Sequence, residues 1–208
     1  MAIGEWINIE FLDVDIKIKK RNKLLFSRDS QCLQELIKLI QLQNHRTIVM
    51  WALDCAKLPL AQFEAKYPKE KRPRNCLELC EAWARGEIKM PIAKHAILGS
   101  HAFAKEINDR EYGALCHAIG HAGATVHVET HALGLPIYEL TSIVLKYGQD
   151  HFHKPVSEKI DYYYNRMLYW QENTDKLRLD WASFLLDDTK PNKEKLLSER
   201  QKLKKQRL

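Results

Sequence analysis

Four histidines lie at two matched spacings in the stretch "HAIGHAGATVHVETHALG", which runs from His117 to Gly134. They form the pairs His117/His121 and His127/His131. Two histidines four residues apart on a helix present both imidazoles on one face, an arrangement that zinc sites use. The stretch is therefore a candidate metal or catalytic site. A tightly packed helix is the competing interpretation, because glycines and alanines surround the histidines.

The spacing along a continuous helix favours packing over metal binding. The two pairs are about ten residues apart, or about 15 Å along the axis, so they cannot share one ion. No carboxylate lies on the histidine face, and the motif HExxH is absent. Gly120, Gly123 and Ala124 would let another helix come close. We therefore predict a packing helix with hydrogen-bonded histidines and no metal, cofactor or catalytic residue. A metal-dependent enzyme using residues 117–131 stays as an alternative.

Other catalytic patterns are weak. The motifs GxSxG and GxGxxG and the P-loop are absent. Cys116 is the cysteine nearest to the histidines, but it lies about 100° around the helix from His117. Cys76 and Cys80 are separated by apolar residues, so we interpret them as small core residues.

The elements that must position these residues are helices. From Ser27 onward the apolar residues recur with helical period. Capping and stop signals divide this pattern into successive helices. The signals used are Asn44 and Asp109 as N-caps, Pro73 and Pro91 as first-turn residues, and Gly86 and Gly148 as stops. One long helix is expected from Asn108 or Asp109 to Gly134, carrying all four histidines.

Only the N-terminal part of the chain carries a β signal. Residues 6–19, "WINIEFLDVDIKIK", alternate apolar and polar with period two, which predicts a bulged strand or a small hairpin. The fold class is therefore an all-α multi-helix bundle with a small N-terminal β strand or hairpin. We expect residues 1–26 to form a β-like segment packed on the domain, residues 27–188 to form a single helical domain, and residues 189–208 to form a basic C-terminal tail.

Length and composition fit one domain. The 208 residues are 45% hydrophobic, and no apolar run is long enough to span a bilayer. The acidic N-terminus does not have the order of charges of a signal peptide, and the number of cysteines, five, is odd. We expect a cytoplasmic protein without a membrane partner.

The net charge of +6 is concentrated at one end of the chain. Eight basic and two acidic residues between Lys190 and Leu208 account for all of it, so the body of the protein is neutral. A globular nucleic-acid-binding protein is expected to carry basic residues on its folded surface. We therefore do not expect a nucleic-acid partner, and association through the basic tail is a further alternative.

Several polar side chains are candidates for contact with a partner protein. Arg72 and Arg74 open a helix, where positive charge opposes the helix dipole. This conflict suggests an acidic partner, either an intramolecular carboxylate such as Asp54 or a second protein. The run "DYYYNRMLYW" holds Tyr163 and Arg166, and exposed aromatic residues next to an arginine resemble interface hot spots.

Three runs of residues resemble one known family. They are "WALDCAKLPLAQFEAKYPKEKRPRNCLELCEAWARGEI", "AKHAILGSHAFAKEI" and "GHAGATVHVETHALGLPIY", within about residues 45–146. Together they resemble the Imm-5-like immunity proteins of bacterial polymorphic-toxin systems. In the last two runs the matched positions are His101, Ala102, Gly120, His121, Ala124, Thr125, His127, Val128, His131, Ala132, Gly134 and Tyr138. The chain departs from the family pattern at Lys71, where an aspartate is usual.

The resemblance implies an all-α protein that binds and neutralises a cognate toxin and is not an enzyme. A homodimer is left open. The positions expected to form the structural signature are Trp51, Asp54, Trp83, Gly120, His121 and Ala124. The positions expected to contact a partner are Arg72, Arg74, His127, His131, Tyr163 and Arg166.

Overall fold

Helices form all the regular structure of residues 11–205, the part of the chain that the computed structural model describes. The α-helices are α1 Leu12–Lys19, α2 Gln34–Gln41, α3 His45–Cys55, α4 Lys57–Lys66, α5 Arg72–Ala84, α6 Met90–Glu106, α7 Arg110–Ala124, α8 Gly134–Tyr147, α9 His153–Asn173 and α10 Lys193–Lys205. Short 3₁₀ turns occupy Gln31–Leu33, Glu129–His131, Thr174–Lys176 and Ser183–Leu185. The all-α prediction is confirmed over this part of the chain.

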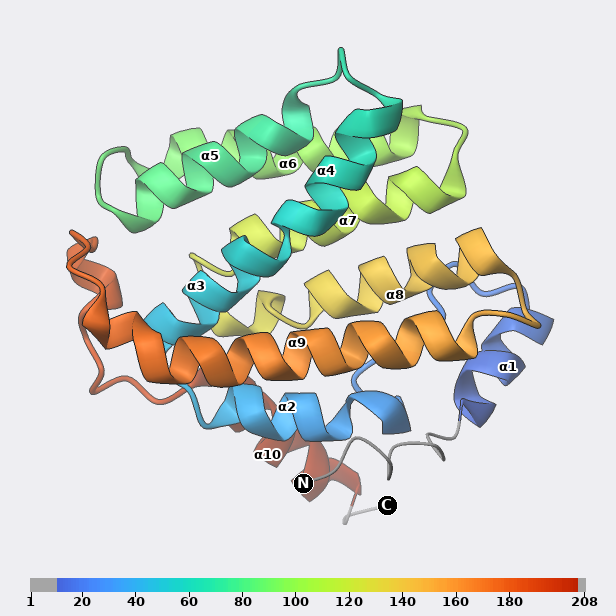
Figure 1. Ribbon diagram of the computed structural model, residues 1–208. Helices are drawn as coiled ribbons and strands as arrows, with labels where there is room; N and C mark the ends of the chain where they lie inside the picture. Colours follow the sequence, from blue (N-terminus) through green and yellow to red (C-terminus); the bar gives the residue numbers. More distant parts are fainter. Residues whose placement is uncertain (1–10, 206–208) are drawn as a thin grey trace.

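The helices pack in two layers (Figure 1). One layer holds α5, α6 and α7, the other holds α2, α8 and α9, and the contact between α7 and α8 joins them. Helices α3 and α4 cross from one layer to the other. Large apolar side chains form the buried core, among them Trp51, Phe63, Ile119, Leu133 and Phe152. In residues 11–205 no helix is both long enough and apolar enough to cross a membrane.

The predicted helix boundaries that rest on capping are confirmed. The side chain of Asn44 accepts a hydrogen bond from the Thr47 amide at 2.8 Å, at the start of α3. Asp109 accepts one from the Tyr112 amide at 3.2 Å, at the start of α7. These bonds satisfy amides that the first turn of a helix leaves without partners.

The predicted N-terminal β element is wrong for the described residues, because residues 12–19 form α1. An alternating strand needs a neighbouring strand for its backbone groups, and the described residues contain none. The charges instead suit a helix, since Asp13 lies in the first turn and Lys17 in the last, with their side chains 3.2 Å apart. Residues 6–10 of the predicted strand lie outside the described residues.

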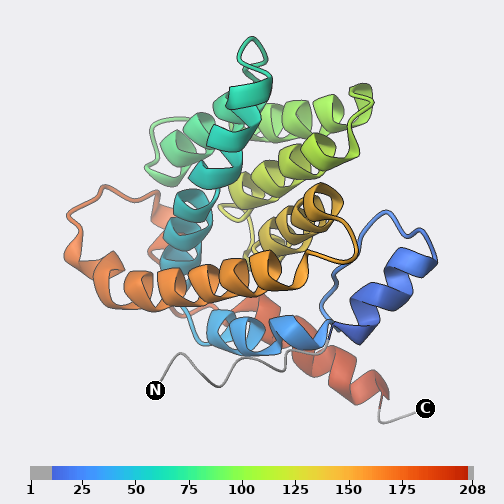
Figure 2. The same cartoon turned by 45° about the vertical axis from the view of Figure 1, so that its right-hand side comes forward.

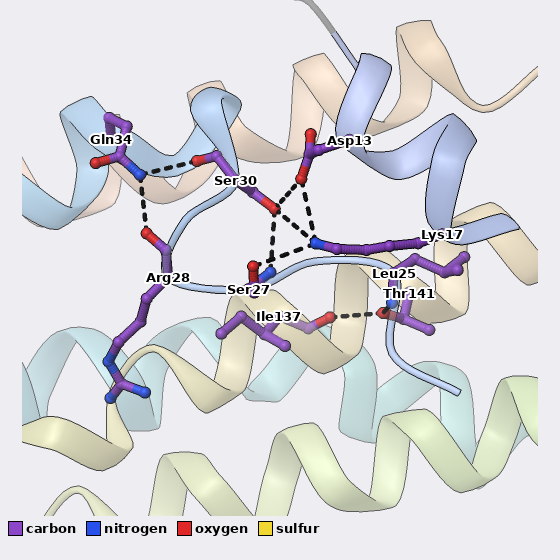
Figure 3. A network of polar contacts seen from close by, with 9 residues as sticks. All are labelled: Asp13, Lys17, Leu25, Ser27, Arg28, Ser30, Gln34, Ile137 and Thr141. Atoms are coloured by element: carbon purple, nitrogen blue, oxygen red, sulfur yellow. Dashed lines mark hydrogen bonds and ion pairs between the residues drawn. The ribbon is translucent and has the colours of Figure 1, made fainter. Parts of the chain in front are cut away.

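A polar network fixes α1 to the rest of the protein (Figure 3). Lys17 Nζ donates to Asp13 Oδ2 and to Ser27 Oγ, both at 3.2 Å. Ser30 Oγ donates to the same Asp13 oxygen at 2.6 Å. Farther along, the Leu25 amide donates to Thr141 Oγ1 of α8 at 3.2 Å. The segment that follows α1 is therefore tied to the second layer by specific bonds.

The basic tail contains α10, which lies along the underside of the molecule below α2 (Figure 2). Its first turn is docked through Glu194, whose side chain is 1% exposed. Arg28 Nε donates to Glu194 Oε1 at 3.0 Å, and Arg28 Nη2 donates to the Thr130 carbonyl at 2.7 Å. Part of the predicted tail is thus packed on the domain, while the domain boundaries themselves stay a prediction.

Candidate functional site

The prediction that one helix runs to Gly134 is wrong, because α7 ends at Ala124. Thr125 closes it: its hydroxyl donates to the His121 carbonyl at 3.0 Å, and its own carbonyl lies 2.7 Å from His45 Nε2. These bonds satisfy carbonyl groups at the helix end. The chain then becomes extended at Val128 and reverses direction before α8 begins at Gly134.

The reversal brings His131 back beside α7. The ring centroids of His121 and His131 are 5.7 Å apart. The prediction that the two HxxxH pairs are separated by about 15 Å on one helix is therefore wrong. His127 has a different environment, since its exposed ring stacks on Trp83 with centroids 6.2 Å apart.

Five rings from four elements form one half-buried cluster, which we call the imidazole face. Its members are His101 of α6, His117 and His121 of α7, His131 of the 3₁₀ turn and Tyr138 of α8. The Nδ1 atoms of His101 and His117 are 2.8 Å apart. Tyr138 lies against both α7 histidines, with centroid distances of 4.9 Å to His117 and 5.2 Å to His121.

Two glycines make room for the rings. A Cβ atom on Gly120 would lie 2.7 Å from Cε1 of His101. A Cβ atom on Gly134 would lie 2.2 Å from Cγ of His121. Both distances are far below van der Waals contact. The glycines of the histidine stretch therefore provide close packing, as predicted, and what packs on them is imidazole.

Burial keeps the histidines of the imidazole face uncharged at neutral pH. It lowers the pKa of His101 to about 4 and that of His121 to about 3, and it lowers the pKa values of His117 and His131 as well. Neighbouring imidazoles also lower the pKa values of His101, His121 and His131. Burial also raises the pKa of the Tyr138 phenol.

The rings contact one another instead of converging on a common point. Within residues 11–205, no three histidine, cysteine, aspartate or glutamate side chains are placed to hold a metal ion. Cys116 is also far from a nucleophilic state, because it is fully buried, which raises the pKa of its thiol to about 12. Cys76 and Cys80 are buried free thiols under Gly123, which confirms them as core residues.

The two arginines of the "RPR" sequence bind carboxylates of the same chain. Arg72 pairs with Glu70 at 2.8 Å and with Glu106 at 2.7 Å, and Arg74 pairs with Glu64. Of the two alternatives, the structure shows intramolecular carboxylates, and contact of Arg72 and Arg74 with a second protein stays a prediction. Glu70 supplies an ion pair even though the usual aspartate is replaced by lysine at the next position.

Asp54 is not the partner of these arginines, so that prediction is wrong. Its Oδ2 atom instead accepts hydrogen bonds from Arg166 Nε at 2.9 Å and from Trp170 Nε1 at 3.0 Å. The bonds join α3 to α9 and use the guanidinium that we expected to face a partner. The Arg166 side chain stays 30% exposed.

Tyr163 is fully buried, so it lies inside the protein and not on its surface. Its hydroxyl donates to Glu139, which also pairs with Lys159 at 2.6 Å. Trp51 packs beside Tyr163 and donates to the Tyr163 carbonyl at 2.9 Å. Trp51 and Trp83, two positions of the expected structural signature, are core residues, since they are 0% and 7% exposed.

Sequence reasoning about the site did not nominate His101 or Tyr138, although both complete the imidazole face. Neither lies in the HxxxH stretch that drew attention. The available signal was the family pattern, which includes His101, His121, His131 and Tyr138 among its matched positions. These family-pattern positions are far apart in the sequence, but the fold brings them together in the imidazole face.

The family model described as "Imm-5 like putative immunity protein" matches residues 38–166, more than half of the chain. The chain belongs to this family. The matched range of this Imm-5-like protein runs from α2 into α9 and contains the whole imidazole face. No curated protein and no solved structure matches the chain.

Proposed function

We propose that this Imm-5-like protein binds a cognate bacterial toxin and neutralises it, with the imidazole face as part of the contact surface. The observation that carries the proposal is the convergence of the family-pattern rings of His101, His121 and His131 at one half-buried surface. Rings that are fixed by packing lose little conformational entropy when a partner covers them, so they suit an interface.

The surroundings of the imidazole face support a protein contact. One turn before His101 on α6, Leu98 is 56% exposed. Just before the 3₁₀ turn, His127 is close enough to act electrostatically on His131, and its exposed ring stacks on Trp83, which in turn contacts the partly exposed Phe184. An exposed apolar side chain beside aromatic rings and hydrogen-bonding nitrogens has the mixed character of a protein interface.

Co-expression with the toxin encoded beside this protein tests the proposal. We expect the wild type to protect a bacterial host and to co-purify with the toxin. The variants Leu98→Asp and His127→Asp should weaken binding by about 1–3 kcal/mol, because each places a charge in the contact surface. Isothermal titration calorimetry with the purified toxin measures the loss.

Lys154→Asp on α9 is the matched control, since this lysine side chain is 85% exposed and lies outside the imidazole face. It should leave affinity unchanged. Equal killing with and without the wild-type protein would refute toxin neutralisation. Full protection by both surface variants would leave neutralisation standing and exclude this contact surface.

A further inference from the structure

A cavity of about 400 Å³ lies where the end of α2, the start of α3 and the start of α10 meet the 3₁₀ turn Glu129–His131. Residues 41–45, His127, Glu129 and Phe184 are among those that line it. The cavity shares no residue with the imidazole face. Cavities of this size hold small ligands or single side chains of a partner, so its chemistry shows what it could bind.

Glu129 is the buried carboxylate of this cavity. The residue is 5% exposed, and its Oε2 atom has no hydrogen-bond partner among the described residues. Within the same part of the chain, no cation forms an ion pair with it. A carboxylate that is removed from water without a partner costs free energy. Glu129 therefore lacks the donor that a buried carboxylate needs, and a ligand in the cavity can supply it.

His45 gives the cavity a second acceptor. Its Nε2 atom lies 2.7 Å from the Thr125 carbonyl, an oxygen that only accepts, so the ring carries its hydrogen on Nε2. Burial lowers the pKa of His45, so the ring is neutral at pH 7 and Nδ1 keeps its lone pair. Glu129 acts electrostatically on His45, which shows that the two groups are close. Both groups accept hydrogen bonds, so a matching ligand brings N–H donors.

Two further carboxylates line the cavity, and both have cations of this chain as partners. Asp187 pairs with Lys190 at 3.0 Å, and Asp188 pairs with Arg46 at 2.8 Å. These four charges balance one another. Glu129 is thus the carboxylate of the cavity whose charge is left for a ligand.

Lys193 and Lys195 also line the cavity, and they would repel a cation. Both residues are exposed, so water and salt screen their charges. The charge of Glu129 is screened much less, because the side chain is buried. A cation inside the cavity is therefore attracted by Glu129 more strongly than it is repelled by the two lysines.

Phe184 gives the cavity an aromatic wall, since its 38% exposed side chain is part of the lining. A guanidinium group is planar, stacks on aromatic rings and donates several hydrogen bonds in one plane. It also pairs with a carboxylate through two parallel hydrogen bonds. An ammonium group has neither the plane nor the paired donors. The combination of carboxylate, neutral imidazole and phenyl ring therefore fits a guanidinium group best.

We propose that this cavity binds a guanidinium group, with Glu129 as its ion-pair partner, His45 as a second acceptor and Phe184 as a stacking wall. The group belongs either to free arginine or to an arginine side chain of the toxin. The site follows from the cavity alone, and only its use by the toxin rests on the toxin-binding function inferred above.

Free L-arginine is the probe for a test that needs no toxin. L-citrulline is the matched control ligand, because it replaces the guanidinium by a neutral group of the same shape. Amide chemical shifts of the full chain, labelled with ¹⁵N, are followed by NMR while each ligand is added. We expect shifts around Glu129 and His45 that saturate with arginine, at a Kd at least about tenfold lower than that of citrulline. Equal affinities, or no arginine binding up to about 10 mM, would overturn the proposal.

Glu129→Gln keeps the size of the side chain and removes its charge. It should weaken arginine binding about tenfold or more. Without arginine its Tm should equal or exceed that of the wild type, because the variant lacks a buried charge that has no partner. Glu158→Gln on α9 is the matched control: this side chain is 65% exposed, so both arginine affinity and Tm should stay unchanged.

Two results with Glu129→Gln would contradict the site. Unchanged arginine affinity would show that the carboxylate does not bind the ligand. A lower Tm without arginine would show that a group of this chain, such as Lys193, already balances Glu129.

A competition measurement identifies the source of the guanidinium group. If an arginine of the toxin occupies the cavity, free arginine should weaken toxin binding and citrulline should not. Equal toxin affinity in the two ligands would assign the site to free arginine. The outcome is independent of neutralisation: toxin protection without arginine binding removes this inference alone, and arginine binding without protection removes the toxin-binding function alone.

Discussion

At the scale of single residues, the imidazole face depends on two glycines, whose lack of a side chain leaves room for the rings. Gly134 begins α8 directly against the His121 ring, and Gly120 lies under the His101 ring. In each case a methyl group would occupy the space of an imidazole. Interiors are close-packed, so such a group forces neighbouring side chains or backbone to move. The position of the rings is therefore set by the glycines as much as by the histidines.

We expect Gly134→Ala to destabilise the protein by about 1–3 kcal/mol, because the new Cβ would lie 2.2 Å from Cγ of His121. Gly99→Ala, inside α6, is the matched control. Its Cβ would lie 3.8 Å from the Arg72 side chain, an ordinary contact, so it should stabilise by about 0.4–1 kcal/mol. Urea unfolding of both variants measures the difference, and equal stabilities would show that the packing at Gly134 is not tight.

At the scale of elements, one arginine connects three parts of the chain that are distant in sequence. Arg28 follows α1, pairs with Glu194 at the start of α10 and donates to the Thr130 carbonyl in the 3₁₀ turn that carries His131. The Glu194 carboxylate is almost fully buried, so its loss would leave a partly buried guanidinium without its partner. The docking of α10 and the placement of His131 are therefore linked through Arg28.

We expect Glu194→Ala to cost about 1–3 kcal/mol of unfolding free energy and to loosen α10. Amide hydrogen exchange should accelerate in α10 and in the 3₁₀ turn that Arg28 contacts, and remain unchanged in α5. Glu158→Ala on α9 is the control: its partner Lys154 is exposed, so the change should stay within about 0.5 kcal/mol. Unaltered exchange in the 3₁₀ turn would show that α10 and His131 are independent.

At the scale of the whole molecule, the buried histidines couple folding to pH. The folded-state pKa values of His101 and His121, about 4 and about 3, lie below the ordinary value of 6.5. Below pH 6.5 the unfolded chain therefore binds protons that the folded chain does not. Their contribution to stability is complete above pH 6.5 and is lost as the pH falls toward 4.

We expect the free energy of unfolding to fall between about pH 6.5 and about pH 5, with a slope of up to about 1.4 kcal/mol per pH unit for each of the two histidines. Burial also lowers the pKa values of His117 and His131, which act in the same direction, whereas burial raises the pKa of Glu139, which acts in the opposite direction. Urea unfolding across the interval measures the slope. A flat profile in the wild type would show that the imidazole face is charged or solvated.

The sequence by itself determined most of the local structure. Asn44, Asp109, Gly86 and Gly148 mark helix ends through contacts within a few residues or through a backbone conformation that glycine allows, with φ of 78° and 75° at the two glycines. The family pattern led to the correct family, because it depends on residue types and order alone.

Only the tertiary structure decided where the histidines meet. Periodicity extended α7 to Gly134, because nothing local shows that His45 of α3 lies beside the Thr125 carbonyl at the true helix end. The wrong prediction for α1 has the same cause. Apolar and polar residues alternate there, but the pattern does not show whether a neighbouring strand exists, and the described part of the chain contains none. The imidazole face requires four elements to pack together, and such long-range contacts leave no period or spacing in the sequence.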